Sequence, residues 1–537
     1  MKSNFKVLLV YPNLPLMLVP PLAVALFTRI IKNNGYKVDL FDTTEYIDFD
    51  GDMSPKNRVK YLQARDFDEK DLGVTIKTGL LKDYKSKVLS YRPDVIMYVA
   101  VVEDVFKKCI QMIDEIHEYE TPSIMGGVFP SVAPEKCLSY ANVKYVGIGE
   151  GENIVIDFID SIYEGRDINN INGIAYKNII DGSIVKNQAS KLVDIEKVLP
   201  DYSLFSKERF YRPMGGNILK SMPLETYRGC PYQCTYCNSP AQRNDSRDRI
   251  KKLQLTNKTE SYSNNFLRRK DMNYLSNEIR KTIKEYKPEL FYFVDDAFMA
   301  RPKEEMNLFC KMYDEFKVPF WFNTRPENCN IEILSELKKV GCYRISFGIE
   351  CGNEEFRIKT LGRKGSNEDI VNWFDTISKA QIPFSVNLII GFPGETRDNV
   401  METIELTRKI KGFDSLTISI FTPYHGTPLR SIAVKNNWLD DDVITVHTTS
   451  SSLLNMPPPF LSKEDIDNLM RVVPLYVYFD KKEWNNIFKI EQLSEDWEGL
   501  YEHYSYLYKK DFLGEDIKKS VIKSSTTGCS SDPKNAI

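Results

Sequence analysis

The sequence is poor in cysteine, nearly neutral in charge, and lacks an unbroken apolar stretch typical of a membrane helix. Ten cysteines in 537 residues are too few for a disulfide scaffold, so a reducing, cytoplasmic compartment is expected. Lysine and arginine total 72 against 75 aspartates and glutamates, so no overall field favours nucleic acid or an anionic membrane as a partner. Residues 7–27 carry no charge, but Pro12, Pro15, Pro20 and Pro21 would break a helix there.

The first 164 residues alternate predicted strands with predicted helices, in a chain long enough for three or four domains. Short apolar runs bounded by turns are typical of buried parallel strands. Strands are expected at 5–10, 38–41, 94–101, 123–127 and 144–148, and helices at 21–34, 103–119 and 151–163. This α/β alternation predicts a doubly wound, Rossmann-like parallel sheet over residues 1–164.

Small residues gather at the carboxyl ends of these strands, where doubly wound sheets bind their ligands. They include Pro20-Pro21, Gly126-Gly127 and the run from Gly147 to Gly151. Glycine allows a bulky ligand to approach the backbone, but it also punctuates ordinary turns. Both interpretations stay open on these residues alone.

Two stretches interrupt the alternation. Residues 42–74 form a polar insertion for which the sequence predicts no place in the fold. Residues 165–222 are expected to form a connector rather than a domain, with a hairpin around Asp181-Gly182.

From residue 223 the alternation restarts and predicts a partial (β/α)6 barrel through residue 430, whose chemistry would lie in the loops after the strands. A mostly helical C-terminal region (431–526) should follow, then a disordered tail (527–537). Barrel strands are expected at 224–228, 290–294, 318–322, 343–349, 384–390 and 415–421, and helices near 272–286, 302–316, 330–340, 367–380 and 397–411; residues 241–270 are expected to be a solvated excursion.

Three cysteines, Cys230, Cys234 and Cys237, follow the first predicted barrel strand at spacings that allow their thiols to converge. Thiolate sites select zinc or iron-sulfur clusters. A structural zinc needs four protein ligands, and a fourth would have to be remote: Cys329, Cys342, Cys351 or one of the four histidines. A [4Fe-4S] cluster would instead keep one iron free for a small molecule.

The cysteine motif, with Tyr236 inside it, resembles that of the radical S-adenosylmethionine (SAM) superfamily. The later stretches Ser346–Glu350, Asn387–Glu395 and Phe421–Leu429 are similar to later barrel strands of that superfamily.

The N-terminal half resembles the cobalamin-binding domain that precedes the barrel in the B12-dependent group of the same superfamily. The similarity lies in Pro20-Pro21-Leu22, Gly126-Gly127, Val146–Glu152 and the hairpin sequence from Ile171.

The resemblance implies that the three cysteines hold a [4Fe-4S] cluster whose fourth iron binds SAM. Asp295 and Asp296 would accept hydrogen bonds from the SAM ammonium, or else cap a helix. Arg325 would pair with the SAM carboxylate, or else form a surface salt bridge. The residues implied to bind SAM are Tyr236, Asp295, Asp296, Arg325, Ser346, Glu350, Asn387, Ile389, Pro423 and Tyr424.

The resemblance also implies a bound cobalamin, with two departures from the group. No Asp-x-His-x-x-Gly segment offers a histidine to cobalt. Phe129 stands where the group often has His, and Val101–Glu103 stand where it often has Ser or Thr. The residues implied to bind cobalamin are Pro20, Pro21, Leu22, Val101, Val102, Glu103, Gly126, Gly127, Val128, Gly149, Glu150 and Gly151.

The function implied is transfer of a methyl group from SAM, by way of cobalamin, to an unactivated carbon of a small-molecule or peptide natural-product intermediate. A cyclisation or rearrangement with the same cofactors is an alternative, and a non-catalytic zinc- or cofactor-binding protein is another. An electron donor such as flavodoxin or ferredoxin would be a partner. Aromatic residues of the C-terminal region would line the substrate pocket or form a core: Tyr476, Tyr478, Phe479, Trp484, Trp497, Tyr501 and Tyr504.

Overall fold

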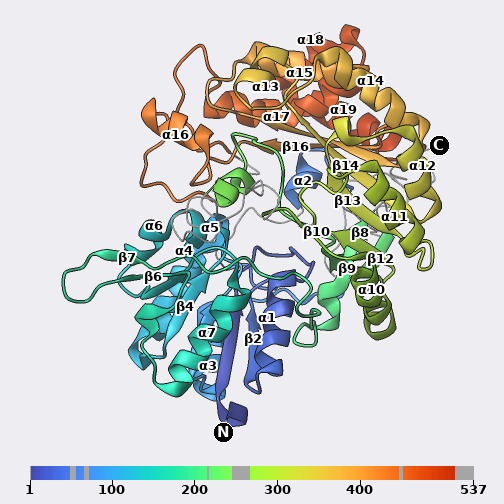
Figure 1. Cartoon of the computed structure of the whole chain (residues 1–537). Helices are drawn as coiled ribbons and strands as arrows, with labels where there is room; N and C mark the ends of the chain where they lie inside the picture. The colour runs from blue at the N-terminus through green and yellow to red at the C-terminus, as the bar shows by residue number, and fades with distance from the viewer. Residues whose placement is uncertain are drawn as a thin grey trace.

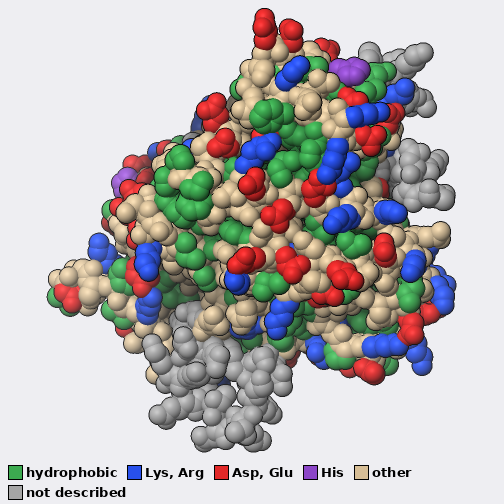
Figure 2. All heavy atoms as spheres, turned by 90° about the horizontal axis from the view of Figure 1, so that it is seen from above, with side chains coloured by type: hydrophobic (Ala, Val, Ile, Leu, Met, Phe, Trp, Pro, Cys, Tyr) green, Lys and Arg blue, Asp and Glu red, His purple; other side chains and the backbone are tan. Residues whose placement is uncertain are grey.

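Two seven-stranded sheets organise the chain, as the computed structural model shows (Figure 1). The structure describes residues 2–48, 56–65, 72–214, 217–244, 266–446 and 451–514. The N-terminal sheet, blue to cyan in Figure 1, lies below the yellow and orange C-terminal sheet and its helices. On the face seen in Figure 2, basic and acidic side chains are interspersed, as expected for a nearly neutral chain.

The first sheet has the order β2-β1-β3-β4-β5-β6-β7, with β1 to β5 parallel. Its parallel strands confirm the predicted ones: β1 (Lys6–Tyr11), β2 (Lys37–Asp42), β3 (Val95–Tyr98), β4 (Ser123–Gly126) and β5 (Tyr145–Gly147). Both faces are covered, because alternate β1 side chains enter different cores. Val7 and Leu9 join the cluster that includes α1 (Leu22–Asn33) and α7 (Gly151–Glu164). Leu8 and Val10 join the cluster of α3 (Leu80–Tyr91) and α4 (Glu103–Ile116).

The predicted connector is divided between the two sheets. Its hairpin, β6 (Ile174–Lys177) and β7 (Ile184–Lys186), pairs antiparallel with β5 and extends the first sheet. Strands β8 (Tyr211–Met214) and β9 (Asn217–Leu224) lie at one edge of the second sheet. The connector is thus strand-forming at both ends.

The second sheet has the order β16-β15-β14-β13-β12-β9-β8, and all of its strands except the edge strand β8 are parallel. Five strands fall where they are predicted: β12 (Leu290–Phe293), β13 (Phe320–Thr324), β14 (Cys342–Glu350), β15 (Phe384–Ile390) and β16 (Ser415–Ile420). The first strand, expected at 224–228, ends at Leu224 instead. The reason is that the N–H groups of Thr226 and Tyr227 donate to the Asp295 carboxylate.

Helices cover the outside of this sheet, and further helices pack on them. The outer helices are α10 (Met272–Tyr286), α11 (Lys303–Tyr313), α12 (Ile331–Lys339), α14 (Asn367–Lys379) and α15 (Arg397–Lys409). The C-terminal layer is α16 (Pro428–Lys435), α17 (Lys463–Tyr478), α18 (Trp484–Glu491) and α19 (Trp497–Asp511). Capping boxes at Ser366, Thr396 and Ser462 fix three helix starts. Over the described ranges, every helix is too short or too polar to cross a membrane.

The polar insertion crosses from the first unit to the second. Helix α2 (Lys56–Lys60), blue in Figure 1, lies among the yellow barrel strands. The backbone N–H of Ile418 on β16 donates to Gln63 Oε1 at 2.9 Å. Tyr501 of α19 donates its hydroxyl to the Lys60 carbonyl at 2.8 Å.

Candidate functional site

The cysteine loop follows the short strand β10 (Tyr227–Arg228) at the carboxyl end of β9. Arg243 holds its first turn by donating to the carbonyls of Cys230 and Tyr232 at 2.8 and 3.1 Å. Burial raises the pKa of Cys230 to about 11 and that of Cys237 to about 12. The thiols of Cys230 and Cys237 therefore carry protons at neutral pH, and a bound metal would displace these protons.

The cysteines considered as a fourth zinc ligand have other neighbours. Cys342 begins β14, at the end of the sheet opposite the loop. Cys329 Sγ lies 3.6 Å from Met299 Sδ, and Cys351 Sγ lies 3.8 Å from Thr403 Oγ1. Within the described ranges, no three His, Cys, Asp or Glu side chains are grouped to hold a single metal ion. Cluster thiolates each bind a different iron, so the loop fits a cluster better than one zinc.

The two acidic residues after β12 have different roles. Asp295 is buried; it accepts hydrogen bonds from the N–H groups of Thr226 and Tyr227 at 2.8 and 3.2 Å and pairs with Arg301 at 2.7 Å. The Asp295 carboxylate thus holds the backbone before the cysteine loop, and its contact with SAM stays a prediction. Asp296 is exposed and accepts from Ser239 Oγ, beside the loop, at 3.0 Å.

Arg325 lies against the cysteine loop. Its guanidinium carbon is 3.9 Å from the centre of the Tyr232 ring, and Nε is 2.8 Å from Glu327. Tyr232 donates to Asn328 at 2.5 Å. Arg325 thus forms the ion pair that the alternative predicted, but its side chain is buried rather than at the surface.

Glu350 ends β14 in a strained conformation, with φ of +69° and a register shift after Gly348. Its carboxylate folds back over Gly348, where a Cβ would lie 2.0 Å from Oε1. Arg363 reaches both Glu350, at 3.3 Å, and the Tyr236 hydroxyl, at 3.0 Å. Arg363 is a residue that the sequence reading missed.

Ser346 lies deeper in the barrel than the end of β14. Its Oγ accepts from Trp321 Nε1 and from Ser385 Oγ, both at 2.9 Å. Trp321 stacks on Tyr292 with ring centres 4.5 Å apart. The Ser346 hydroxyl is thus engaged with neighbouring strands, four residues below Glu350.

A cavity of about 230 Å³ lies beside Tyr236 and Ile389. Tyr424 also lines it, and its hydroxyl donates to Asp104 of the first unit at 3.1 Å. Asn387 and Pro423 do not line it; the Pro423 carbonyl accepts from Arg430 at 2.9 Å. The complete lining is Asn57, Arg58, Tyr61, Gln63, Tyr236, Ile389, Ile418, Ser419, Ile420, Phe421, Thr422, Tyr424 and Met470.

A larger cavity, about 550 Å³, lies at the carboxyl ends of β3, β4 and β5. A Cβ on Gly126 or Gly149 would meet no atom within 4 Å, so these positions leave room for a ligand. Gly127 serves the fold instead, because a Cβ there would lie 2.3 Å from the Val101 nitrogen. The predicted residues that line the cavity are Pro21, Leu22, Val102, Gly126, Gly127, Val128, Gly149, Glu150 and Gly151.

Pro20, Val101 and Glu103 do not line this cavity, so their contact with cobalamin stays a prediction. Val101 is fully buried, and its backbone pairs with Gly126. Glu103 accepts from His425 Nδ1 at 2.7 Å and from the Thr445 N–H at 2.8 Å. Although burial acts to raise the pKa of Glu103, these contacts hold it below its usual value. Glu103 and the loop histidine thus join the two units.

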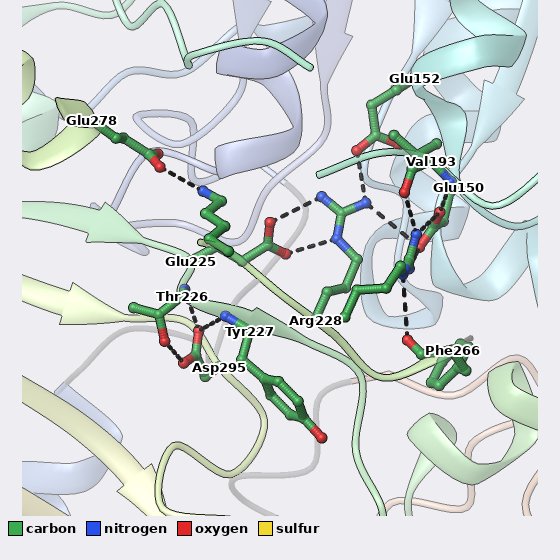
Figure 3. A network of polar contacts seen from close by, with 12 residues as sticks. Glu150, Glu152, Val193, Glu225, Thr226, Tyr227, Arg228, Phe266, Glu278 and Asp295 are labelled. Carbon is green, nitrogen blue, oxygen red and sulfur yellow. Dashed lines mark hydrogen bonds and ion pairs between the residues drawn. The ribbon is translucent and has the colours of Figure 1, made fainter. Parts of the chain in front are cut away.

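A charged network connects the large cavity with the cysteine loop (Figure 3). Arg228, two residues before Cys230, pairs with Glu152 at 2.8 Å and with Glu225 at 2.8 and 3.1 Å. Arg268 pairs with Glu150 and donates to the Val193 carbonyl at 2.6 Å. Glu150, Glu152, Glu225 and Arg228 also line the cavity. Spacing in the sequence gives no signal for these pairs.

The C-terminal aromatics pack mainly with one another. Tyr476 donates to Glu491 at 2.8 Å and lies edge-on to Trp484. Tyr504 contacts Phe479 edge-on, with ring centres 4.9 Å apart. Neither cavity is lined by an aromatic residue of this region, so among the described residues these side chains form a core between helices.

Comparison with known proteins agrees with this geometry. The radical SAM superfamily model matches residues 224–407, and the B12 binding domain model matches residues 59–159. An uncharacterized methyltransferase of Pyrococcus horikoshii is 23% identical over 479 residues, which are 86% of this chain and 94% of the relative.

Two solved structures share the whole architecture. TsrM from Kitasatospora setae, a radical SAM methyltransferase with tryptophan and a SAM analogue bound, has a TM-score of 0.60 at 15% identity and covers 94% of this chain and 99% of its own. OxsB, a cobalamin-dependent radical SAM enzyme with aqua-cobalamin and SAM bound, has a TM-score of 0.61 at 16% identity and covers 97% and 74%. At such identities the likeness establishes the fold.

A doubly wound sheet with a large cavity at its strand ends, followed by an open barrel with a three-cysteine loop, defines the class as a radical SAM enzyme. The chain carries a radical SAM domain at residues 224–407 and, ahead of it, a B12-binding domain at residues 59–159, which is the arrangement of a cobalamin-dependent radical SAM enzyme.

Proposed function

We propose that this enzyme is a cobalamin-dependent radical SAM methyltransferase that methylates an unactivated carbon of a small-molecule or peptide natural-product intermediate. One observation carries the proposal: Arg228 lines the large cavity and lies two residues before Cys230. The candidate cobalamin cavity and the candidate cluster loop therefore share a structural element. A methyl carrier next to a radical source is the arrangement that such a reaction needs.

Cys230, Cys234 and Cys237 are the proposed ligands of a [4Fe-4S] cluster. Asp296 and Arg325 both lie beside the cysteine loop, and we assign to Asp296 a hydrogen bond from the SAM ammonium and to Arg325 an ion pair with the SAM carboxylate. When bound, the cluster and SAM supply the radical that removes hydrogen from the substrate carbon, and cobalamin carries the methyl group of a second SAM.

The other protein groups would orient the cofactors and enclose them. Tyr236, Ile389 and Tyr424 surround the smaller cavity, which fits the adenosyl group. Arg363 fixes Tyr236 and Glu350, so the wall of that cavity is rigid before SAM arrives. Gly126 and Gly149 leave the space that a corrin would fill. An external reductant such as flavodoxin or ferredoxin would supply electrons.

Methyl-labelled SAM tests the reaction class under anaerobic, reducing conditions with candidate substrates. Label in the product together with 5'-deoxyadenosine supports methyl transfer. Release of 5'-deoxyadenosine together with an unlabelled, altered product would refute methyl transfer and indicate a cyclisation or rearrangement instead.

The Cys234→Ala variant tests the cluster assignment. We expect no 5'-deoxyadenosine from this variant and unchanged corrin absorption, because Cys234 is not among the residues that line the large cavity. Retained SAM cleavage would refute the assignment, and loss of both cofactors would show general misfolding.

A further inference from the structure

The insertion between β2 and β3 belongs to the first unit in sequence but lies on the barrel of the second. Strands β16 and β8 are the two edges of the open sheet. On the β16 side, Gln63 caps the Ile418 N–H at 2.9 Å. On the other side, Val59 and Ile218 of β9 pack against one small apolar cluster. Residues 56–65 therefore lie across the side opening of the barrel.

The C-terminal helices hold this segment in place. Arg65 donates through Nε to the Leu513 carbonyl at 2.7 Å, and the Tyr501 hydroxyl donates to the Lys60 carbonyl at 2.8 Å. Tyr61 and Gln63 are 6% and 3% exposed. Side chains so buried on a polar insertion have a defined position, which a solvated loop would not give them.

Four side chains of the segment line the smaller cavity: Asn57, Arg58, Tyr61 and Gln63. The cavity wall contributed by the barrel is mostly apolar or aromatic and includes Ile389, Phe421 and Tyr236. The insertion thus adds two carboxamides, a phenol and a guanidinium to a cavity whose other walls offer mostly flat, apolar contacts.

This combination suits a purine. A purine ring stacks on aromatic or apolar side chains, and its edge carries donors and acceptors that an Asn or Gln amide can pair. Because Gln63 Oε1 already accepts from Ile418, the side-chain NH2 group is the part of this amide left to donate to a ring nitrogen.

We propose that residues 56–65 form a wall of the SAM nucleoside site, with Tyr61 and Gln63 as specificity-determining contacts to the adenine. The inference rests on the proposed function, since it takes the adenosyl group to occupy the smaller cavity. The first unit of the chain then contributes to SAM recognition as well as to cobalamin binding.

Binding of S-adenosylhomocysteine and of 5'-deoxyadenosine tests this wall, measured by anaerobic calorimetry on reconstituted protein. In Gln63→Glu the carboxylate still accepts from Ile418 but the amide donors are gone, and Tyr61→Leu keeps apolar volume without the ring. We expect each substitution to lower the affinity for both ligands by about tenfold. The matched controls, Gln492→Glu and Tyr506→Leu, change exposed side chains outside the cavity, one directly after α18 and one on α19, and should bind both ligands as wild type does.

Cluster content and thermal melting confirm that each variant is folded before binding is compared. Unchanged affinity in folded variants overturns the inference, as does an effect on the organic substrate alone. Failure of the wild-type protein to bind either nucleoside would instead count against the proposed function itself. 5'-Deoxyadenosine has no amino-acid part. If the variants lose affinity for it as well as for S-adenosylhomocysteine, the lost contact is with the nucleoside.

Discussion

Glu395, in the loop after β15, carries a buried carboxyl group whose ionisation should oppose folding. The N–H groups of Gly391 and Phe392 donate to its Oε2 at 2.6 and 3.2 Å, while Oε1 has no hydrogen-bond partner among the described residues. Burial raises the pKa of Glu395 from 4.5 to about 8, although the two N–H groups act in the opposite direction. The group is therefore mostly protonated at neutral pH.

A carboxyl group whose pKa is raised on folding favours the folded state most below its ordinary pKa, and this contribution is lost as the pH rises through the folded pKa. For the pKa shift of Glu395, the free energy of unfolding falls by about 2 kcal/mol by pH 6 and by about 5 kcal/mol by pH 9, relative to low pH. Glu395→Gln keeps an acceptor for the two N–H groups and cannot ionise. The free energy of unfolding of the variant, relative to that of wild type, should therefore increase by about 3 kcal/mol between pH 6 and pH 9.

Denaturant unfolding of the metal-free protein, at both pH values and under reducing conditions, measures this gain. Glu402→Gln, at an exposed position on α15, serves as the matched control and should show no pH-dependent gain. If the unfolding free energies of Glu395→Gln and wild type change by the same amount between the two pH values, ionisation of the carboxyl group does not destabilise the fold, and the reasoning is refuted.

Four further substitutions give distinct outcomes. Gly126→Leu should abolish corrin absorption without lowering the melting temperature, because the side chain enters open cavity space, whereas Gly127→Ala should destabilise the fold through its contact with Val101. Arg363→Leu should cost about 3–5 kcal/mol in unfolding free energy by leaving Glu350 buried and unpaired, and should weaken SAM binding; an unchanged midpoint would contradict the pairing. Asp295→Asn should reduce iron content after reconstitution, since its carboxylate holds the backbone before the cysteine loop.

The strand and helix order of both sheets is encoded locally, which is why it is predictable. Alternate side chains of β1 are buried in two separate cores, so the strand has no polar face. A short apolar run without a polar face predicts a buried parallel strand directly. Helix α14 begins at the capping box of Ser366 and Asp369, a signal that spans only four residues. The cysteine spacing is equally local.

The unpredicted features depend on pairs far apart in the chain. Gln63 meets Ile418 across 355 positions, and Arg363 meets Tyr236 across 127. A polar insertion has neither apolar periodicity nor a cap that would indicate its destination. The backbone contacts of Asp295 were not predicted for a related reason: a carboxylate at a strand end has the same sequence signature whether it faces a ligand or the backbone of its neighbour.

The pairing of Arg228 indicates that the two units form one folding and functional body. Its guanidinium contacts Glu225 from the barrel and Glu152 from α7, and all three side chains are largely buried. Buried charges are stable only with their partners in place, so the backbone before Cys230 reaches this geometry only when the first unit is docked. Assembly of the cluster loop is then coupled to the sheet that lines the large cavity, and the isolated barrel should hold the cluster less tightly than the full chain.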